Sequence, residues 1–258
     1  MPELPDLQVF SQNLDKQLAG KKLEKINVFK KAKTNVSGAA LKKTLEGQSL
    51  KRVYREGKEL RFAFQDKNIL GLHLMLRGKL SWIGEGDEIS NTLLEMFFSA
   101  GKAIALSDYQ YNARITLNPE EARAPDALSN EVNEKFWKEK LQTRATIKNL
   151  LLDQHIVRGI GNAYADEILW DAGISPFSIS KQIPAARIKA LARSVKKVLK
   201  NAEKQIKKAE PGIIGGEIRD FLLIHNSKKK QSPTSATIKQ KTAGGRKTYY
   251  TAEQELFS

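Results

Sequence analysis

The sequence predicts an α+β protein, with an N-terminal helix and β-sandwich followed by a helical region and a C-terminal β-hairpin. Three observations indicate this class. Apolar residues recur at helical spacing within the first twenty positions. From about residue 23 to 117 the chain consists of short runs rich in β-branched and aromatic residues, separated by Gly, Asp and Asn. Beyond about residue 143 the helical spacing returns.

The first helix follows from apolar residues at Leu7, Phe10, Leu14 and Leu18, with Gly20 as a natural stop. The strands follow from the runs "KINVF", "LRFAF", "KLSWI", "LLEMFF" and "KAIALSD". Several strands at this spacing favour a β-sandwich. The polar, Pro-containing stretch "NPEEARAPDALSNEVN" is typical of a linker.

Three further helices are expected at about 143–154, at 163–171 and at 185–208. The last has an apolar stripe of Ile188, Leu191, Val195, Val198, Ala202 and Ile206. Ten basic residues oppose two acidic ones between positions 181 and 210, so its other face is strongly cationic. The sequence leaves two interpretations of this cationic face open, a solvated surface and a surface that contacts phosphates.

The C-terminal part predicts a β-hairpin, because "SATIKQK" and "RKTYYTAEQ" alternate on either side of the glycine turn "TAGG". For the stretch "SKKKQSPTS" a disordered basic tail is the competing interpretation.

Charge and cysteine content limit the function. A net charge of +15 and a pI of about 9.8 in 258 residues point to a polyanionic partner. Nucleic acid is the first choice and an anionic membrane surface the lesser one. The absence of cysteine excludes disulfides and thiolate metal sites. With no signal-peptide pattern and no long apolar run, we expect a cytoplasmic, nucleoid-associated protein, or a nuclear one in a eukaryote.

The opening stretch "MPELPDL" places a carboxylate beside a proline that becomes the N-terminus if Met1 is removed. Pro2 would then present a secondary amine, and with an α-amino pKa of about 7.7 to 8.0 roughly a tenth or more of it is unprotonated near neutral pH. Such an amine attacks a sugar aldehyde carbon and forms an iminium, and Glu3 could move the protons. Most chains that begin Met-Pro use the proline for nothing chemical.

The stretch "RGIGNAYADEI" predicts a tight glycine turn leading into a helix, with Asn162 at the N-cap position. Backbone N–H groups at a helix start bind anions, and the Asn162 amide can donate as well. Taken alone, phosphate binding and an ordinary capped helix are equally good interpretations.

These motifs together resemble those of the formamidopyrimidine-DNA glycosylase and endonuclease VIII family. "LLDQHIVRGIGNAYADEILWDAGISP" is similar to the family's helix-two-turn-helix signature, and "MPELPDL" to its N-terminus. "VYREGKEL" followed by "ILGLHLMLRGKL" resembles its paired strands, and "GGRKTYYTAEQ" resembles its finger hairpin. The resemblance covers nearly the whole chain in the right order.

The resemblance implies a DNA glycosylase and AP lyase of base excision repair. Pro2 would attack C1′ of a damaged deoxynucleoside, form a Schiff base and cut the strand by β- and δ-elimination. Glu3 would protonate the ring oxygen and later shuttle protons. Lys58, in "EGKEL", matches the family's lysine beside the lesion phosphate.

Four further residues match DNA-binding positions of the family. His73, Asn162 and Arg246 correspond to positions that grip phosphates around the everted nucleotide. Leu76 corresponds to the side chain that fills the hole left by the flipped base. A core histidine and a core leucine are the alternatives for His73 and Leu76.

The match departs from the family at three places. Where the family's finger holds zinc with four cysteines, this chain has Gln231, Thr234, Thr251 and Gln254, so we expect no metal and no cofactor, as in zincless members. "SDYQYNARI" replaces an Arg-Arg-Phe run that inserts opposite the lesion, and Tyr109 or Tyr111 could stack there instead. Only a few residues separate "GGEIRDF" from "IHNSKKK", whereas the branch that removes 8-oxoguanine has a longer loop.

We therefore expect a monomer acting on damaged double-stranded DNA, with no membrane partner. Residues 1–120 would form the catalytic domain, 121–140 a linker, 141–224 the helix-two-turn-helix domain and 225–258 the zincless finger. Oxidised pyrimidines and hydantoins are the favoured substrates. The alternatives are 8-oxoguanine or formamidopyrimidine specificity, and a non-catalytic DNA- or RNA-binding protein on the same scaffold.

Overall fold

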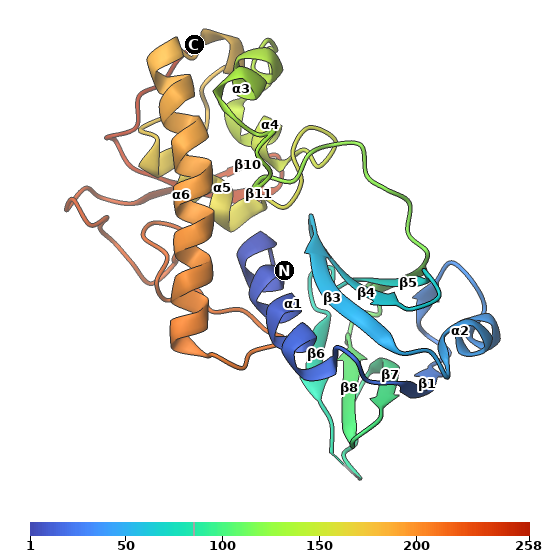
Figure 1. Ribbon diagram of the computed structural model, residues 1–258. Helices are drawn as coiled ribbons and strands as arrows, with labels where there is room; N and C mark the ends of the chain where they lie inside the picture. Colours follow the sequence, from blue (N-terminus) through green and yellow to red (C-terminus); the bar gives the residue numbers. More distant parts are fainter. Residues whose placement is uncertain (85) are drawn as a thin grey trace. The chain divides into compact units, whose positions relative to one another are not determined.

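The computed structural model describes residues 1–84 and 86–258. The chain forms two compact units, which are described separately (Figure 1). The first consists of residues 1–121 with 206–217, and the second of residues 122–205 with 218–258. The first is rich in strands and the second in helices, which confirms the predicted α+β class.

The first unit contains two sheets, as a sandwich requires. One has the order β1-β7-β8-β6, formed by Leu23–Val28, Thr92–Phe98, Lys102–Ser107 and Lys79–Trp82, and is antiparallel throughout. The other has the order β2-β9-β5-β4-β3, formed by Lys33–Thr34, Arg114–Leu117, Ile69–His73, Glu59–Phe64 and Leu50–Glu56. Only its β2–β9 pair is parallel. Central strands of both sheets bury runs of consecutive residues, which include Phe62 of β4 and Ile104 of β8.

Two helices accompany these sheets. Helix α1 (Leu4–Leu18) lies against β3 (Figure 1) and buries the apolar positions that predicted it. Helix α2 (Gly38–Leu45) corrects the expectation of strands throughout this region. The Ser37 hydroxyl caps it by accepting a 3.1 Å hydrogen bond from the Ala40 N–H, and Leu41 and Leu45 are fully buried.

The second unit contains α3 (Glu134–Lys140), α4 (Ile147–Leu152), α5 (Asn162–Asp171), the short 3-10 turn η1 (Ser180–Gln182) and most of α6 (Ala185–Ala209). The segment expected to be a linker thus includes α3, whose Trp137 is fully buried. Helix α4 is shorter than its pattern predicted. The α6 stripe is buried as predicted, apart from the partly exposed Val198.

The C-terminal hairpin is confirmed. Strands β10 (Lys239–Ala243) and β11 (Arg246–Tyr250) pair antiparallel, and β11 packs against α5. Gly244 and Gly245 form the two-residue turn with φ of 55° and 73°, a conformation that glycine adopts without strain. In the described part of the chain, no helix is both long and apolar enough to cross a bilayer.

Candidate active site and nucleic-acid interface

The start of the chain is fixed by the first turn of α1. Glu3 is the N-cap residue, and its carboxylate accepts a hydrogen bond from the Asp6 N–H. The Asp6 carboxylate accepts one in return from the Glu3 N–H at 2.8 Å. Both side chains are buried. This reciprocal capping holds the backbone next to Pro2 in one conformation.

Pro2 lines a cavity of about 630 Å³ in the first unit. Leu76, Arg77, Tyr109 and Glu217 line the same cavity. The α-amino group of Met1 forms an ion pair with the Glu217 carboxylate. The predicted nucleophile, Pro2, and the predicted wedge, Leu76, therefore line the same cavity, whose wall includes the cationic Arg77.

A tight turn presents Leu76 to solvent. The Gly78 N–H donates to the Leu74 carbonyl at 2.8 Å, and Met75 takes a positive φ of 54°. A Cβ on Gly78 would lie only 2.3 Å from that carbonyl oxygen, so the turn requires glycine. Leu76 is 59% exposed, which excludes the alternative that it is a core residue.

Tyr109 and Tyr111 have different environments. The buried Asp108 carboxylate accepts backbone N–H bonds from Gln110, Asn112 and Ala113 at 2.8 to 2.9 Å, and this fixes the loop. Tyr109 is 57% exposed at the Pro2 cavity. The Tyr111 hydroxyl donates to the Asn91 side chain at 2.6 Å. Only Tyr109 of the two thus lines the Pro2 cavity.

Lys58 and His73 lie near each other in the first unit. Lys58 follows Gly57 (φ 58°) in the turn of the β3–β4 hairpin, and His73 ends β5. Burial, and then the charges of Lys58 and Arg114, lower the pKa of His73 to about 4. Its Nδ1 accepts the Met75 N–H at 3.2 Å. The neutral ring therefore carries its hydrogen on Nε2 and can donate a hydrogen bond there.

In the second unit, Asn162 is the first residue of α5 and Gly161 is the N-cap, so the predicted N-cap position was wrong by one residue. The reason is that the extended backbone of Gly161, not of Asn162, leads into the helix. The Asn162 amide instead donates to the Lys247 carbonyl at 2.9 Å. Arg246, the neighbour of Lys247, is exposed directly after the glycine turn. Asn162 and Arg246 thus belong to one connected substructure.

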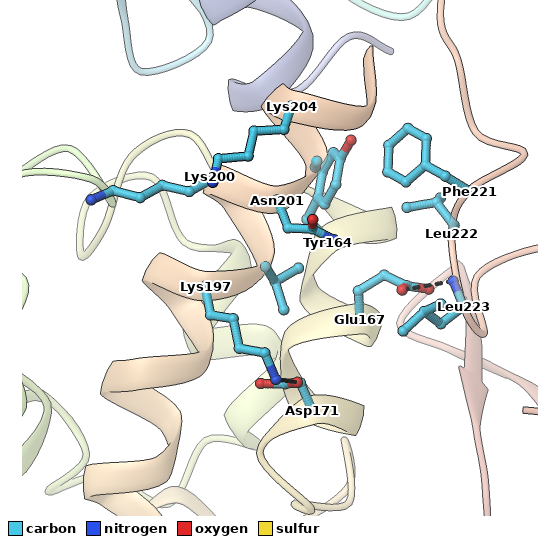
Figure 2. Close-up of a pocket in the computed structure, with 12 residues that line it drawn as sticks. Tyr164, Glu167, Asp171, Lys197, Lys200, Asn201, Lys204, Phe221, Leu222 and Leu223 are labelled. Carbon is cyan, nitrogen blue, oxygen red and sulfur yellow. Dashed lines mark hydrogen bonds and ion pairs between the residues drawn. The ribbon is translucent and has the colours of Figure 1, made fainter. Parts of the chain in front are cut away.

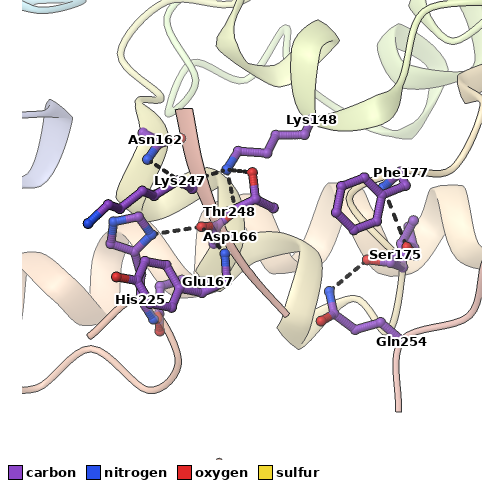
Figure 3. A network of polar contacts seen from close by, with 12 residues as sticks. Lys148, Asn162, Asp166, Glu167, Ser175, Phe177, His225, Lys247, Thr248 and Gln254 are labelled. Atoms are coloured by element: carbon purple, nitrogen blue, oxygen red, sulfur yellow. Dashed lines mark hydrogen bonds and ion pairs between the residues drawn. The ribbon is translucent and has the colours of Figure 1, made fainter. Parts of the chain in front are cut away.

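A buried charge network joins β11 to α5 (Figure 3). Asp166 has no solvent exposure and lies 2.7 Å from Lys148 Nζ and 2.7 Å from His225 Nδ1. It also accepts the backbone N–H of Tyr249 at 2.9 Å. Lys148 continues the network by donating to the Thr248 hydroxyl at 2.8 Å. The sequence pattern did not predict this network, whose only signal was the adjacent acidic residues Asp166 and Glu167 in the middle of α5.

Glu167, the next residue, holds another segment on α5. Its buried carboxylate accepts backbone N–H bonds from Leu223, Ile224 and His225 at 2.8 to 2.9 Å. Burial raises the pKa of Glu167, while these hydrogen bonds act in the opposite direction. The short segment before "NSKKK" is therefore anchored along its backbone.

Two of the positions aligned with zinc ligands, Thr234 and Thr251, form hydrogen bonds to Glu253. Its carboxylate accepts from the hydroxyls of Thr234 at 2.9 Å and Thr251 at 3.1 Å. The Gln254 side chain accepts from the Thr251 N–H and donates to the Ile174 carbonyl. Among residues 1–84 and 86–258, no group of three His, Asp or Glu side chains could hold a metal ion.

Comparison with known proteins identifies the family of this chain. Two family models match: the formamidopyrimidine-DNA glycosylase N-terminal domain over residues 1–115 and its H2TH domain over residues 123–210. The formamidopyrimidine-DNA glycosylase of Lactobacillus gasseri is 30% identical over 216 residues, which are 80% of this chain and 78% of that protein. That of Ureaplasma parvum is 29% identical over 97% of this chain and 98% of its own.

Solved structures extend the similarity to the whole fold. The Lactococcus lactis Fpg bound to DNA with an abasic site is 25% identical, with a TM-score of 0.87 over 97% of this chain and 98% of its own. The same organism's Fpg in complex with DNA containing an oxidised pyrimidine is 26% identical, with the same TM-score and coverage. This chain belongs to the formamidopyrimidine-DNA glycosylase and endonuclease VIII family. It is accordingly a DNA glycosylase of base excision repair.

Proposed function

We propose that this protein is a monomeric, bifunctional DNA glycosylase and AP lyase that removes oxidised bases from double-stranded DNA. The observation that carries the proposal is the position of Pro2, at the wall of a cavity that it shares with an exposed apolar side chain, Leu76. Residues 1–120 carry the chemistry and contact DNA through His73 and Leu76, while the domains 141–224 and 225–258 contact DNA through Asn162 and Arg246 respectively.

Removal of Met1 generates the nucleophile. The Pro2 nitrogen lone pair attacks C1′ of the damaged deoxynucleoside, the bond from C1′ to the base breaks, and the base leaves with a proton. The ring C1′–O4′ bond then opens, and the nitrogen and C1′ form an iminium. Its positive charge acidifies the C2′ hydrogen, so that loss of a proton expels the 3′ phosphate and a second elimination expels the 5′ phosphate.

Glu3 and Lys58 serve this sequence in different ways. Glu3 is adjacent to the amine and held by the α1 cap, so its carboxyl can protonate O4′ and later take the C2′ proton. The Lys58 ammonium, presented by a hairpin turn, stabilises the charge of the lesion phosphate.

Binding must offset the cost of everting the nucleotide, about a few kcal/mol, and a similar cost of bending the duplex. His73 Nε2, the Asn162 amide and the Arg246 guanidinium donate hydrogen bonds to phosphates. Leu76 fills the hole in the stack. Tyr109, exposed in the same cavity, is the better candidate for stacking against the opposite base.

Oxidised pyrimidines and hydantoins are the favoured substrates. Supporting observations are the short segment that Glu167 anchors and the similarity to an Fpg solved with an oxidised pyrimidine. Formamidopyrimidines and 8-oxoguanine form the second candidate class, because the curated relatives carry the formamidopyrimidine name.

Borohydride trapping tests the chemistry. The mature protein mixed with a lesion duplex and borohydride should yield a covalent protein–DNA complex, whereas Pro2→Gly should yield much less. If the wild type forms no complex on any lesion or abasic duplex, the protein is a binder and not an enzyme. Single-lesion duplexes, read for cleavage and for the phosphate ends left behind, then separate the two substrate classes.

A further inference from the structure

A second cavity, of about 520 Å³, lies wholly within the second unit (Figure 2). It is formed by α5 from Tyr164 to Asp171, the middle of α6 and residues 221–223. Its apolar lining comes from Val198, Ala202, Phe221, Leu222 and Leu223. This size is typical of sites that bury a ligand or a large side chain, for which about 300 to 1,000 Å³ is usual.

The walls of this cavity are held open by polar bonds. Glu167 anchors residues 223 and 224 through their backbone N–H groups at 2.9 and 2.8 Å. On the α6 side, Asp171 accepts hydrogen bonds from Ser194 Oγ and Lys197 Nζ, each at 2.6 Å. The apolar surface is therefore preformed, and Leu223 remains 38% exposed on it.

The edge of the cavity carries positive charge. Lys200 and Lys204 are exposed, lie one helical turn apart on α6 and line the cavity. Neither has an ion-pair partner among the residues that the structure describes, whereas Lys197 is paired with Asp171. Spacing of i and i+4 places two cations on the same face, about 6 Å apart at their Cβ atoms.

We propose that this cavity is a docking site for an acidic segment of a partner protein, with a large apolar side chain in the cavity and flanking carboxylates on Lys200 and Lys204. An apolar lining beside two free ammonium groups matches such a segment in both shape and charge. A DNA backbone matches it poorly, since a phosphodiester has no large apolar group to bury in this lining. The Glu167 and Asp171 carboxylates in the wall are already bonded, to the Leu223 N–H and to Lys197. Asn162, the proposed phosphate contact, begins α5, whereas these carboxylates lie further along it.

This inference goes beyond the glycosylase activity and is tested apart from it. The probes are short fluorescein-labelled acidic peptides with a central Phe, Leu or Trp, and a matched peptide with Ser at the centre. Fluorescence anisotropy with the full chain should show binding of the apolar peptides and about tenfold weaker binding of the Ser peptide. The double variant Lys200→Glu, Lys204→Glu should lose about tenfold in affinity.

Lys189→Glu is the matched control, because it reverses one exposed charge on α6 away from the cavity. It should bind the peptides as the wild type does. The Lys200→Glu, Lys204→Glu variant should cleave a lesion duplex at the wild-type rate, and a saturating abasic-analogue duplex should leave peptide affinity unchanged. Failure of all apolar peptides to bind, equal binding by both charge variants, or displacement by duplex would each overturn the proposal.

Discussion

In the first unit, the residues around Pro2 are held by backbone geometry, whereas in the second unit Asn162 and Arg246 are connected through buried charges. A reciprocal cap fixes the start of α1, and the close approach of Gly78 to Leu74 fixes the turn that exposes Leu76. The hairpin that carries Arg246 is instead joined to α5 through Asp166.

This difference predicts how substitutions in each unit should affect stability and activity. In the first unit, the cap needs a side-chain oxygen at Glu3 and Asp6 and the turn needs Gly78, so a catalytic side chain can be replaced with little effect on folding if the replacement keeps the hydrogen-bond acceptor. A buried ion pair is costly to disrupt, because the remaining charge is left without compensation. In the second unit, we therefore expect DNA binding and local stability to change together.

The largest effect is expected from Glu3→Gln. Loss of the proton-transferring carboxyl should lower the rate of base excision by about 10² to 10⁴. The amide oxygen can still accept the Asp6 N–H, so the unfolding temperature should change little. Single-turnover kinetics and thermal unfolding measure the two effects, and a large fall in unfolding temperature would contradict the proposed separation.

Asp166→Asn should cost stability in the second unit. It leaves the buried Lys148 ammonium without its carboxylate, a change that typically costs about 3 to 5 kcal/mol. Denaturant unfolding should show this loss, and affinity for an abasic-analogue duplex should fall with it.

Two further variants control for this effect. Adding Lys148→Met should recover part of the stability, since no buried charge then remains uncompensated. Lys197→Ala removes the exposed partner of Asp171 and should cost less than about 1 kcal/mol. Equal losses for Asp166→Asn and Lys197→Ala would show that the buried ion pair contributes no more to stability than the exposed one.

Gly78→Ala should disturb the first unit through the backbone alone. The added Cβ meets the Leu74 carbonyl oxygen and strains the turn by about 1 to 3 kcal/mol. Base excision should fall because Leu76 is displaced. Gly212→Ala is the matched control, since no atom lies within 4 Å of its added Cβ. Normal excision by Gly78→Ala would show that the turn does not position Leu76.

The smallest effect concerns pH and His73. Its folded-state pKa of about 4 lies below the ordinary value of 6.5, so the unfolded chain binds the proton more readily. This group's contribution to stability is full above pH 6.5 and decreases as the pH falls toward 4. Between pH 6.5 and pH 4, the free energy of unfolding of His73→Gln should therefore fall less than that of the wild type. Denaturant unfolding at each pH measures both. Parallel curves, or an NMR titration of His73 near 6.5, would contradict this.

Much of the fold could be predicted because helical and strand periodicities are local. The helix beginning near Leu7, the strands around Phe62 and Ile104, and the hairpin turn at Gly244 all followed from neighbouring residues. Helix α2 escaped because its cap and two buried leucines give a weak signal within a region of strands.

The candidate site was predictable only in part. Motif positions located Pro2, Asn162 and Arg246, but periodicity could not show that Leu76 is exposed. The bonds that Asp166 makes to Lys148 on one side and to His225 and Tyr249 on the other join segments far apart in the sequence. Such partners are chosen by tertiary packing, which no local pattern encodes.

The hydroxyl contacts of Glu253 bear on how the finger responds to oxidants. Oxidised bases arise where peroxides are abundant, and peroxides attack thiolates readily. A finger held by threonine hydroxyls and a carboxylate offers no sulfur to that attack, since the chain contains no cysteine. Peroxides that oxidise thiolates therefore have no target in this finger.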